Sequence, residues 1–265
     1  MNLLDNKITV IYNTCDKYEP LWNGFFTQFK KYWSGYTGDI VLNTEEKSFA
    51  FEGLDIIRPV GKNTGCSWSQ RILNSLAAVS TPYVVMILDD FYFKSPVKTG
   101  VIDECTARMD KDRDTMLFTF GWQPGKNIPD PESELFERRG RFAPYRVNAQ
   151  IGLWRVSYLK KILRSYENPW QFELSGSFRS SLYGGKLYSL KKDAPLVFDY
   201  DWGFLIIRGK LNREVSDYFA QHEGLDMELP FEPFDGDARA DEMSKGRGRR
   251  IVGYAKDAVV SLFKR

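Results

Sequence analysis

Short apolar runs alternate with helical patterns over the first hundred residues of the chain. Runs typical of buried strands occupy residues 8–12, 39–43, 55–60 and 83–88. Between them, residues 21–33 and 68–79 place apolar side chains three or four positions apart, as a helix with one buried face requires, and Ser67 is a candidate N-cap. Strands that alternate with helices favour right-handed crossovers. We therefore predict an α/β fold with a mostly parallel, doubly wound central sheet flanked by helices.

The second half of the chain is less regular. Residues 116–120 and 147–154 predict two further strands, and the segment 123–144 between them is polar and rich in proline and arginine. A connection of this length in a compact domain is typical of a lid or a binding loop. From Ser244 the composition changes to a basic segment, which we separate from a domain of residues 1–243.

The composition is that of a globular protein and excludes several kinds of site. The 265 residues are 43% hydrophobic and 27% charged, and a net charge of +2 does not indicate a nucleic-acid binder. One histidine and three cysteines without CxxC spacing predict neither a structural zinc site nor a disulfide framework. We expect a cytoplasmic protein that is not integral to a membrane, because the sequence shows no secretory signal and no long apolar run. The aromatic content of 15% suggests a surface on which rings or sugars stack.

The strongest candidate for chemistry is the acidic pair that follows the apolar run YVVMIL. Asp89 and Asp90 are adjacent carboxylates at the end of a predicted strand, where they repel each other and lose hydration. A cation relieves both costs, and oxygen ligands suit Mg²⁺ or Mn²⁺, with a diphosphate supplying further positions. The alternative is that Asp90 only caps the loop that follows.

A glycine-containing segment, residues 61–71 (GKNTGCSWSQR), precedes the second predicted helix. Glycines such as Gly65 let the backbone approach a ligand, a helix N-terminus favours anions, and Lys62 or Arg71 adds positive charge. The segment therefore predicts a phosphate site, but a turn capped by Ser67 explains it equally well.

Polar residues also follow the first two strand runs. Asn13, Thr14 and Asp16 after the first run have the chemistry to hydrogen-bond a base or a ribose, but as turn-forming residues they are more simply explained by a loop. Asn43 and Thr44 after the second run leave the same two alternatives.

Residues 167–173 (ENPWQFE) combine carboxylates with an aromatic ring. Trp170 has a face on which a sugar stacks, and Glu173 is a candidate general base toward a hydroxyl group. The alternative is a helix boundary, with Trp170 in the core and Glu173 beside the positive end of the helix. Trp154 is either a platform for an acceptor or, by a small margin, a core residue. His222 is expected at a surface, because no second histidine or cysteine supports catalysis.

The segment 244–265 combines positive charge with an apolar stripe. It holds seven basic residues and one acidic residue, Asp257. The apolar stripe has helical spacing and consists of Ile251, Tyr254, Ala255, Ala258, Val259, Leu262 and Phe263. A basic amphipathic helix is typical of a segment that lies on an anionic membrane surface. The alternative is a C-terminal helix docked on the domain with solvated lysines.

Three segments resemble GT-A-fold nucleotide-sugar glycosyltransferases, of the type found in bacterial capsule, O-antigen and exopolysaccharide loci. They are residues 10–26, 67–93 and 152–173, and IIRGKLNRE at 206–214 adds a fourth. Together they extend over most of residues 8–214, in the order and at the spacing of that family.

The resemblance implies a role for the loops on the donor side. In that fold the loop after the first strand binds the base and ribose, and here it holds Asn13, Asp16 and Lys17. The helix start before the acidic strand meets the ribose or the diphosphate, and it holds Trp68, Ser69 and Arg71.

The resemblance also implies the reacting groups. Asp89 and Asp90 take the place of the family's Asp-x-Asp metal motif, but without an intervening residue. This departure leaves open whether Mg²⁺ or Mn²⁺ is required, since lysine or arginine is an alternative partner for the diphosphate. Glu173 matches the catalytic base of inverting members, and Arg208 and Lys210 would close over the donor phosphates.

The function implied by the resemblance is that of an inverting hexosyltransferase-type enzyme. It would transfer a sugar from a nucleotide diphosphate, with UDP favoured, to a lipid-linked saccharide in bacterial surface polysaccharide synthesis. Residues 1–120 would bind the nucleotide, residues 121–243 the acceptor, with Trp154 and Trp170 facing it, and the tail would hold the enzyme peripherally at the inner face of the membrane. The alternative is a non-catalytic, membrane-peripheral module that binds a saccharide or nucleotide. A sugar nucleotidyltransferase ranks lower, because NTCDKYEP lacks glycine.

Overall fold

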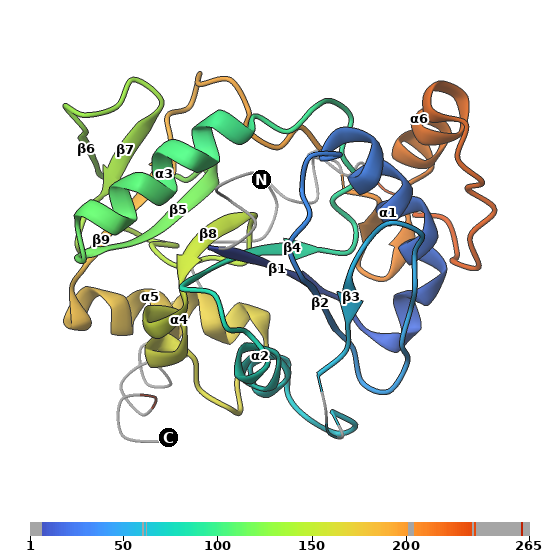
Figure 1. Cartoon of the computed structure of the whole chain (residues 1–265), viewed down its shortest axis with the longest axis horizontal. Coiled ribbons are helices and arrows are strands. Elements are labelled where there is room, and N and C mark those ends of the chain that lie inside the picture. The colour runs from blue at the N-terminus through green and yellow to red at the C-terminus, as the bar shows by residue number, and fades with distance from the viewer. Residues whose placement is uncertain are drawn as a thin grey trace.

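The protein is built around one mixed β-sheet (Figure 1). The computed structural model describes residues 7–59, 61, 63–200, 204–234, 236 and 261. Nine strands of the described residues form this sheet in the order β3-β2-β1-β4-β8-β5-β9-β7-β6. Its parallel first half consists of β3 (Ile56–Ile57), β2 (Ile40–Asn43), β1 (Ile8–Asn13) and β4 (Tyr83–Leu88). Every residue of β1 is buried, as expected of a parallel strand covered on both faces.

The second half of the sheet mixes strand directions. β8 (Gly152–Arg155) lies between β4 and β5 (Thr115–Trp122) and is antiparallel to both. β9 (Lys186–Leu190) is parallel to β5. The hairpin of β6 (Asn127–Pro129) and β7 (Phe136–Arg139) completes the edge, so part of the segment predicted as a lid or binding loop belongs to the sheet.

The strand predicted over residues 147–154 begins only at Gly152. Residues 147–151 form the loop that enters β8, so the prediction is wrong for them. The physical reason is that their backbone groups bond to helix side chains: the Val147 N–H donates to Ser177 Oγ at 3.0 Å, and the Ala149 N–H donates to Glu173 Oε1 at 2.9 Å. An apolar run alone does not reveal such partners.

Helices cover both faces of the sheet. α1 (Glu19–Tyr32), α3 (Thr99–Lys111) and α6 (Arg213–Glu223) contribute to the core on one face (Figure 1). α2 (Trp68–Ala77), α4 (Val156–Ile162) and α5 (Pro169–Tyr183) contribute to the core on the other. Along β1, Val10 and Tyr12 belong to the first core and Ile11 to the second, which is the alternation of a strand. The predicted fold class, α/β with a large, mostly parallel sheet flanked by helices, is confirmed.

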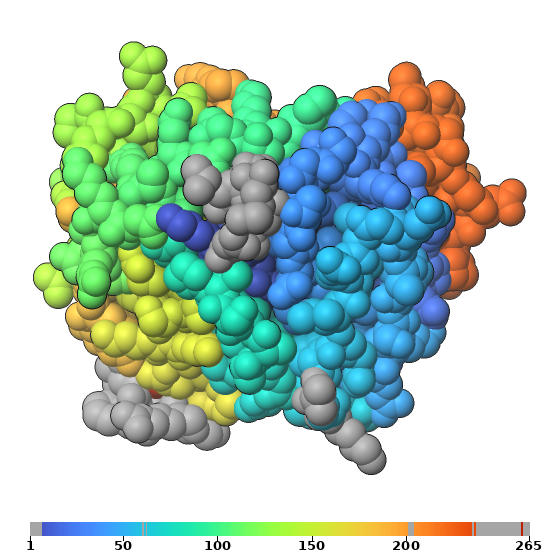
Figure 2. All heavy atoms as spheres, in the orientation of Figure 1, coloured from blue at the N-terminus to red at the C-terminus, as the bar shows by residue number. Residues whose placement is uncertain are grey.

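The helices on the second face begin at defined caps. Ser67 is the N-cap of α2, as predicted, because its Oγ accepts the Gln70 N–H at 3.0 Å. α5 begins with a reciprocal capping box between Asn168 and Gln171. In the space-filling view, α4 (yellow) lies beside α2 (teal), and the blue and cyan surface of α1 and the residues after it adjoins α2 on its other side (Figure 2).

The basic segment 244–265 lies outside the described residues except at Ser261. Ser261 is buried, its Oγ accepts a hydrogen bond of 2.7 Å from Arg179, and its carbonyl accepts one of 3.0 Å from Arg164. At this residue the chain is therefore docked on α5 and the end of α4. Among the described residues, none of the helices combines the length and the apolar character needed to cross a bilayer.

Candidate active site

The carboxyl ends of three parallel strands meet at one edge of the sheet. Asn13 of β1 is in register with Asn43 of β2 and with Leu88 of β4. The Asn43 amide donates to Asn13 Oδ1 at 2.6 Å, and the Ser75 hydroxyl of α2 donates to Asn43 Oδ1 at 3.1 Å. These side chains are buried, so the amides join the strand ends into a fixed polar floor. This edge is where α/β sheets bind ligands.

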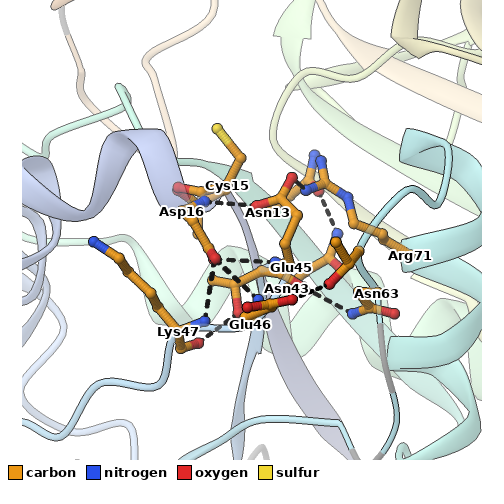
Figure 3. Close-up of polar contacts among 12 residues, drawn as sticks. Asn13, Cys15, Asp16, Asn43, Glu45, Glu46, Lys47, Asn63 and Arg71 are labelled. Atoms are coloured by element: carbon orange, nitrogen blue, oxygen red, sulfur yellow. Dashed lines mark hydrogen bonds and ion pairs between the residues drawn. The ribbon is translucent and has the colours of Figure 1, made fainter.

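Asp16 ties the loop after β1 to the loop after β2 (Figure 3). Its carboxylate accepts the backbone N–H groups of Glu45, Glu46 and Lys47 at 3.0–3.2 Å. In return, the Asp16 N–H donates to Glu45 Oε2 at 2.6 Å. Because both carboxylate oxygens already accept backbone donors, the structure shows Asp16 shaping these two loops.

Arg71, in the first turn of α2, brings a largely buried positive charge to the same edge (Figure 3). It forms an ion pair and hydrogen bond with Glu45. Burial lowers the pKa of the guanidinium, whereas the nearby Cys15, Asp16 and Asp89 raise it. Arg71 Nε is buried and has no hydrogen-bond partner among the described residues. The guanidinium is thus one of the cations that this edge offers to an anion.

Burial raises the pKa of both strand-end acids at this edge. Burial raises the pKa of Asp89 to about 6, although the Thr14 hydroxyl donates to its Oδ2 at 2.6 Å. Thr14 in turn accepts the Trp22 indole N–H at 2.9 Å, which fixes the hydroxyl. Burial and the neighbouring Asp89 raise the pKa of Asp90 well above its usual value. A cation bound by both carboxylates would stabilise their ionised forms, and the same cation would bind an anionic ligand.

The acidic pair fits a divalent cation only as part of a ligand set. No group of three or more His, Cys, Asp or Glu residues that would hold a metal ion occurs in the described parts of the chain. Mg²⁺ commonly uses one or two protein carboxylates and completes its shell with substrate phosphates and water. Asp89 and Asp90 match that pattern, and they do not match a closed protein cage.

Glu173 lies on the first turns of α5 and faces the loop that enters β8. Its Oε1 accepts the Ala149 N–H at 2.9 Å, and burial of the carboxyl group raises its pKa to about 7. A carboxyl group with such a pKa exchanges protons near neutral pH, which is what a general base requires. The structure therefore gives Glu173 suitable electrostatics for the role predicted from the sequence.

A chain of contacts joins Glu173 to the acidic pair. Gln150, beside Ala149, accepts the Tyr200 hydroxyl through Oε1 at 2.7 Å. The Tyr200 ring stacks at 4.3 Å on Phe91, the residue that follows Asp90. Met86 pairs with Gly152, so β4 leaves the sheet toward Asp89 at the same edge at which the chain enters β8. The loop that contacts Glu173 and the acidic pair thus lie at the same edge of the sheet.

A small hairpin brings further positive charge to the loop after β1. β10 (Ile206–Ile207) and β11 (Lys210–Leu211) pair around a turn in which Arg208 and Gly209 both have positive φ. A Cβ atom built on Gly209 would lie 3.5 Å from Lys17 Nζ, which places the turn beside the loop. Arg208 and Lys210, predicted to close over phosphates, are the neighbours of Gly209 in this turn, and Lys210 Nζ forms an ion pair with Glu232 at 3.3 Å.

Some predicted site residues belong to the interior. Trp154 is fully buried and packs on Phe172, so its prediction as an acceptor residue is wrong and the core interpretation holds. Ser69 is fully buried and its N–H donates to the Glu167 carbonyl at 3.1 Å, so its hydroxyl does not reach a ligand. Trp68 is half-buried against Phe172. Trp170, by contrast, is 64% exposed at the start of α5.

Several residues of the site carry no signal of their own in the sequence. The side chains of Glu45, Gln150 and Tyr200 hydrogen-bond to residues at least 26 positions away in the chain, and Trp22 donates to Thr14 eight positions before it. Only the position of Glu45 could have indicated its role, because it lies in a loop that follows a strand at the predicted binding edge of the sheet. Gly65 is an exposed turn residue with φ of +74°, and its position allows a backbone approach.

A large surface depression among the described residues lies away from this edge. It has a volume of about 660 Å³ and is lined by Asn23, Thr27, Lys30, Lys31, Ala50, Phe51 and Glu52. None of the predicted site residues lines it, so we assign the site from the strand ends and not from the volume of this depression.

Comparison with known proteins identifies no family. No protein-family model and no curated protein matches the sequence. Among solved structures, S. aureus TarS 1–349 matches with a TM-score of 0.48 and 12% identity over 71% of this chain and 59% of that one. The same protein in complex with UDP-GlcNAc gives 0.45 and 12%, over 71% and 57%. 2-C-methyl-D-erythritol 4-phosphate cytidylyltransferase from Thermus thermophilus gives 0.42 and 10%, over 75% and 93%.

This chain therefore spans about three fifths of the TarS fragment that it resembles. With TM-scores below 0.5 and identities of 10 to 12%, these matches assign no activity to it. The chemistry has to be argued from its own residues.

Proposed function

We propose that the protein is a glycosyltransferase that uses a nucleotide-diphosphate sugar, with UDP as the first candidate nucleotide. The observation that carries the proposal is the pairing of two kinds of carboxyl group at one strand edge. Asp89 is buried and Asp90 is half-buried, a positive charge would stabilise both carboxylates, and Glu173 has its pKa raised to about 7. Transfer of a sugar needs both, a place for a leaving diphosphate and a base for the incoming hydroxyl.

In the proposed reaction Glu173 takes the proton from the acceptor hydroxyl. The hydroxyl oxygen then forms a bond to the anomeric carbon while the bond between that carbon and the phosphate oxygen breaks, and the electron pair leaves with the nucleoside diphosphate. Attack from the face opposite the leaving group inverts the anomeric configuration. The Ala149 N–H holds the Glu173 carboxylate through one oxygen, and the other oxygen remains for the proton.

Positive charge for the leaving diphosphate is proposed to come from several sources. Arg71 lies on the α2 side of the edge, and Lys17, Arg208 and Lys210 lie around the hairpin. A bound Mg²⁺ or Mn²⁺ would neutralise further charge, with Asp89 and Asp90 as its protein ligands. Asn13 and Gly65 are proposed to bound the nucleoside and phosphate pockets of this edge.

The acceptor and the setting are finer proposals. Exposed Trp170, three residues before Glu173, suits stacking on a saccharide ring. We propose a lipid-linked saccharide acceptor in the synthesis of a bacterial surface polysaccharide, with hexosyl transfer, and an enzyme peripheral to the inner face of the membrane. The basic segment 244–265 supports this setting by its charge.

Calorimetric titration with UDP, with and without Mn²⁺, tests the donor site. We expect binding that Mn²⁺ strengthens and that Asp90→Asn makes insensitive to Mn²⁺, because the variant removes one ligand charge. The exposed Asp193→Asn is the matched control and should bind as the unchanged protein does. No heat of binding under either condition would exclude the glycosyltransferase and leave the non-catalytic saccharide-binding module.

A further inference from the structure

The helix α5 presents an apolar face outward. Trp170, Leu174, Phe178 and Leu182 recur every four residues and therefore lie on one side of the helix. Trp170 is 64% exposed and Leu182 46%, and Leu174 and Phe178 are half-buried. The opposite side of α5 holds Phe172 and other buried residues of the core. Large apolar side chains left on the surface in a row of this kind mark an interaction surface.

The loop before β8 extends this apolar face. Arg141 Nε donates to the Ser181 carbonyl of α5 at 2.8 Å, and Ser177 Oγ donates to the Val147 carbonyl at 3.0 Å. These bonds hold the loop along the helix, with Phe142 78% exposed and Tyr145 42% exposed. We call Phe142, Tyr145, Trp170, Leu174, Phe178 and Leu182 the α5 face.

Positive charge borders the α5 face at its two ends: the exposed Arg141 guanidinium lies 5.7 Å from the Phe142 ring, and Lys161 and Arg164 contact Tyr183. Residues 138–192 hold twelve Lys and Arg but only two Asp and Glu, although Arg139, Arg146 and Arg179 are buried and Lys186 pairs with Asp112. Of the two acids, Glu167 is buried in an ion pair with Arg179, and the pKa of Glu173 is raised to about 7. Near the end of α5, Lys161 Nζ lies 4.8 Å from the Tyr183 ring, and Arg164 donates to the Tyr183 hydroxyl.

We infer that the α5 face is the surface by which this protein contacts an anionic lipid bilayer. Exposed aromatic and aliphatic side chains enter the headgroup region, and flanking Lys and Arg attract anionic lipids. The same charge disfavours a second copy as the occupant, because a symmetric contact would bring two such cationic faces together. The contact does not depend on the basic segment 244–265, of which the structure describes only Ser261, beside α5 and the end of α4.

The lipid contact would place the candidate base close to the bilayer. Glu173 directly precedes Leu174 of the α5 face, and its Ala149 partner belongs to the loop that carries Phe142 and Tyr145. That a lipid-linked acceptor reaches Glu173 from this side rests on the proposed function. The contact with the bilayer itself rests only on the apolar and charged residues of the surface.

Vesicle co-sedimentation of the full chain tests the inference. We expect binding to vesicles of phosphatidylcholine mixed with phosphatidylglycerol, and much weaker binding to phosphatidylcholine alone. The double variant Phe142→Ser/Leu182→Ser should lose about tenfold in partition coefficient, because two exposed apolar side chains no longer enter the interface. The matched control is Trp122→Ser, since Trp122 is 39% exposed but lies on β5 outside the α5 face. A second variant, Lys160→Glu/Lys161→Glu, should lose binding only to the anionic vesicles.

Three outcomes would overturn the inference. The first is an unchanged protein that ignores anionic vesicles. The second is a folded double variant, checked by circular dichroism, that binds as tightly as the control. The third is self-association in size-exclusion chromatography that the double variant abolishes without any vesicle binding, which would make a second copy the occupant. If the protein binds vesicles but not UDP, the proposed function is contradicted and the inferred membrane contact is supported.

Discussion

The two sides of the strand edge handle their polar groups in opposite ways. On the β1–β2–α2 side, acids and amides satisfy one another: Asp16 accepts three backbone N–H groups, and Arg71 pairs with Glu45. On the β4–β8–α5 side, Asp89, Asp90 and Glu173 are carboxyl groups whose pKa values burial raises. The hydrogen bonds and ion pair of the first side therefore fix the conformation of its loops. On the second side, ionisation of the buried carboxyl groups costs free energy, and a bound substrate or cation would reduce that cost.

Removing the candidate base should have the largest effect on the reacting side. We expect Glu173→Gln to lower kcat about a thousandfold, since general-base catalysis contributes on that scale, and to leave UDP binding unchanged. The measurement is sugar transfer or, without a known acceptor, slow hydrolysis of UDP-sugars. The exposed Glu134→Gln is the control, and a fully active Glu173→Gln would remove the residue from the mechanism.

The pH profile of the same reaction offers a second readout. Because the pKa of Glu173 is raised to about 7, the carboxylate that takes the proton is lost below that pH. The rate should therefore fall about tenfold for each unit of pH below 7 and level off above it. The residual activity of Glu173→Gln should lack that inflection.

Relieving the charge at Asp89 should raise stability and remove activity together. The folded protein holds the Asp89 proton with a pKa of about 6 against an ordinary 3.8, so its ionisation destabilises the fold as pH rises through that interval. Asp89→Asn should thus gain about 3 kcal/mol in free energy of unfolding at pH 7, measured by urea denaturation. The gain should vanish near pH 4, and exposed Asp193→Asn should show none at either pH. A loss of stability at pH 7 would mean that the Thr14 hydrogen bond outweighs the burial of the charge.

Loosening the shape-holding side should have the smallest effect on rate. Asp16→Ala leaves the N–H groups of Glu45, Glu46 and Lys47 without their acceptor, so we expect a loss of about 1 kcal/mol in stability. The KM for the donor should rise several-fold while kcat stays close to its original value. Asp16→Asn keeps one acceptor oxygen, so its stability and its KM should lie between those of the unchanged protein and those of Asp16→Ala. A collapse of kcat instead would place Asp16 among the reacting groups.

The features that could be predicted from the sequence are strands, helices and caps that depend on residues close together in the chain. The run YVVMIL became β4 at the predicted bounds, and Ser67 capped α2 as expected, because both features are local. The edge loops also followed, since parallel strands bring their carboxyl ends together. α3 and α6 were not assigned, because their buried residues are few and lie among polar ones.

What escaped prediction depends on contacts between distant residues. The apolar character of Trp154 fits both a core and a platform, and only its packing on Phe172 decides for the core. Asp16 has the chemistry of a ligand, but the backbone of residues 45–47 already occupies its oxygens. The link from Phe91 through Tyr200 to Gln150 joins segments more than a hundred positions apart on one side and fifty on the other.

The docking of Ser261 changes how the C-terminus should be handled in experiments. Arg179 is fully buried, and its charge is balanced by Glu167 and completed by the Ser261 hydroxyl. Glu167 also receives the Ser69 N–H of α2 on its carbonyl, so one short stretch supports the starts of two helices. A protein shortened at residue 244 would leave a guanidinium in the interior short of one acceptor. Weak vesicle binding by such a truncation would then have two explanations, a destabilised α5 or the loss of the basic segment. Substitutions within the segment that keep Ser261 separate the two.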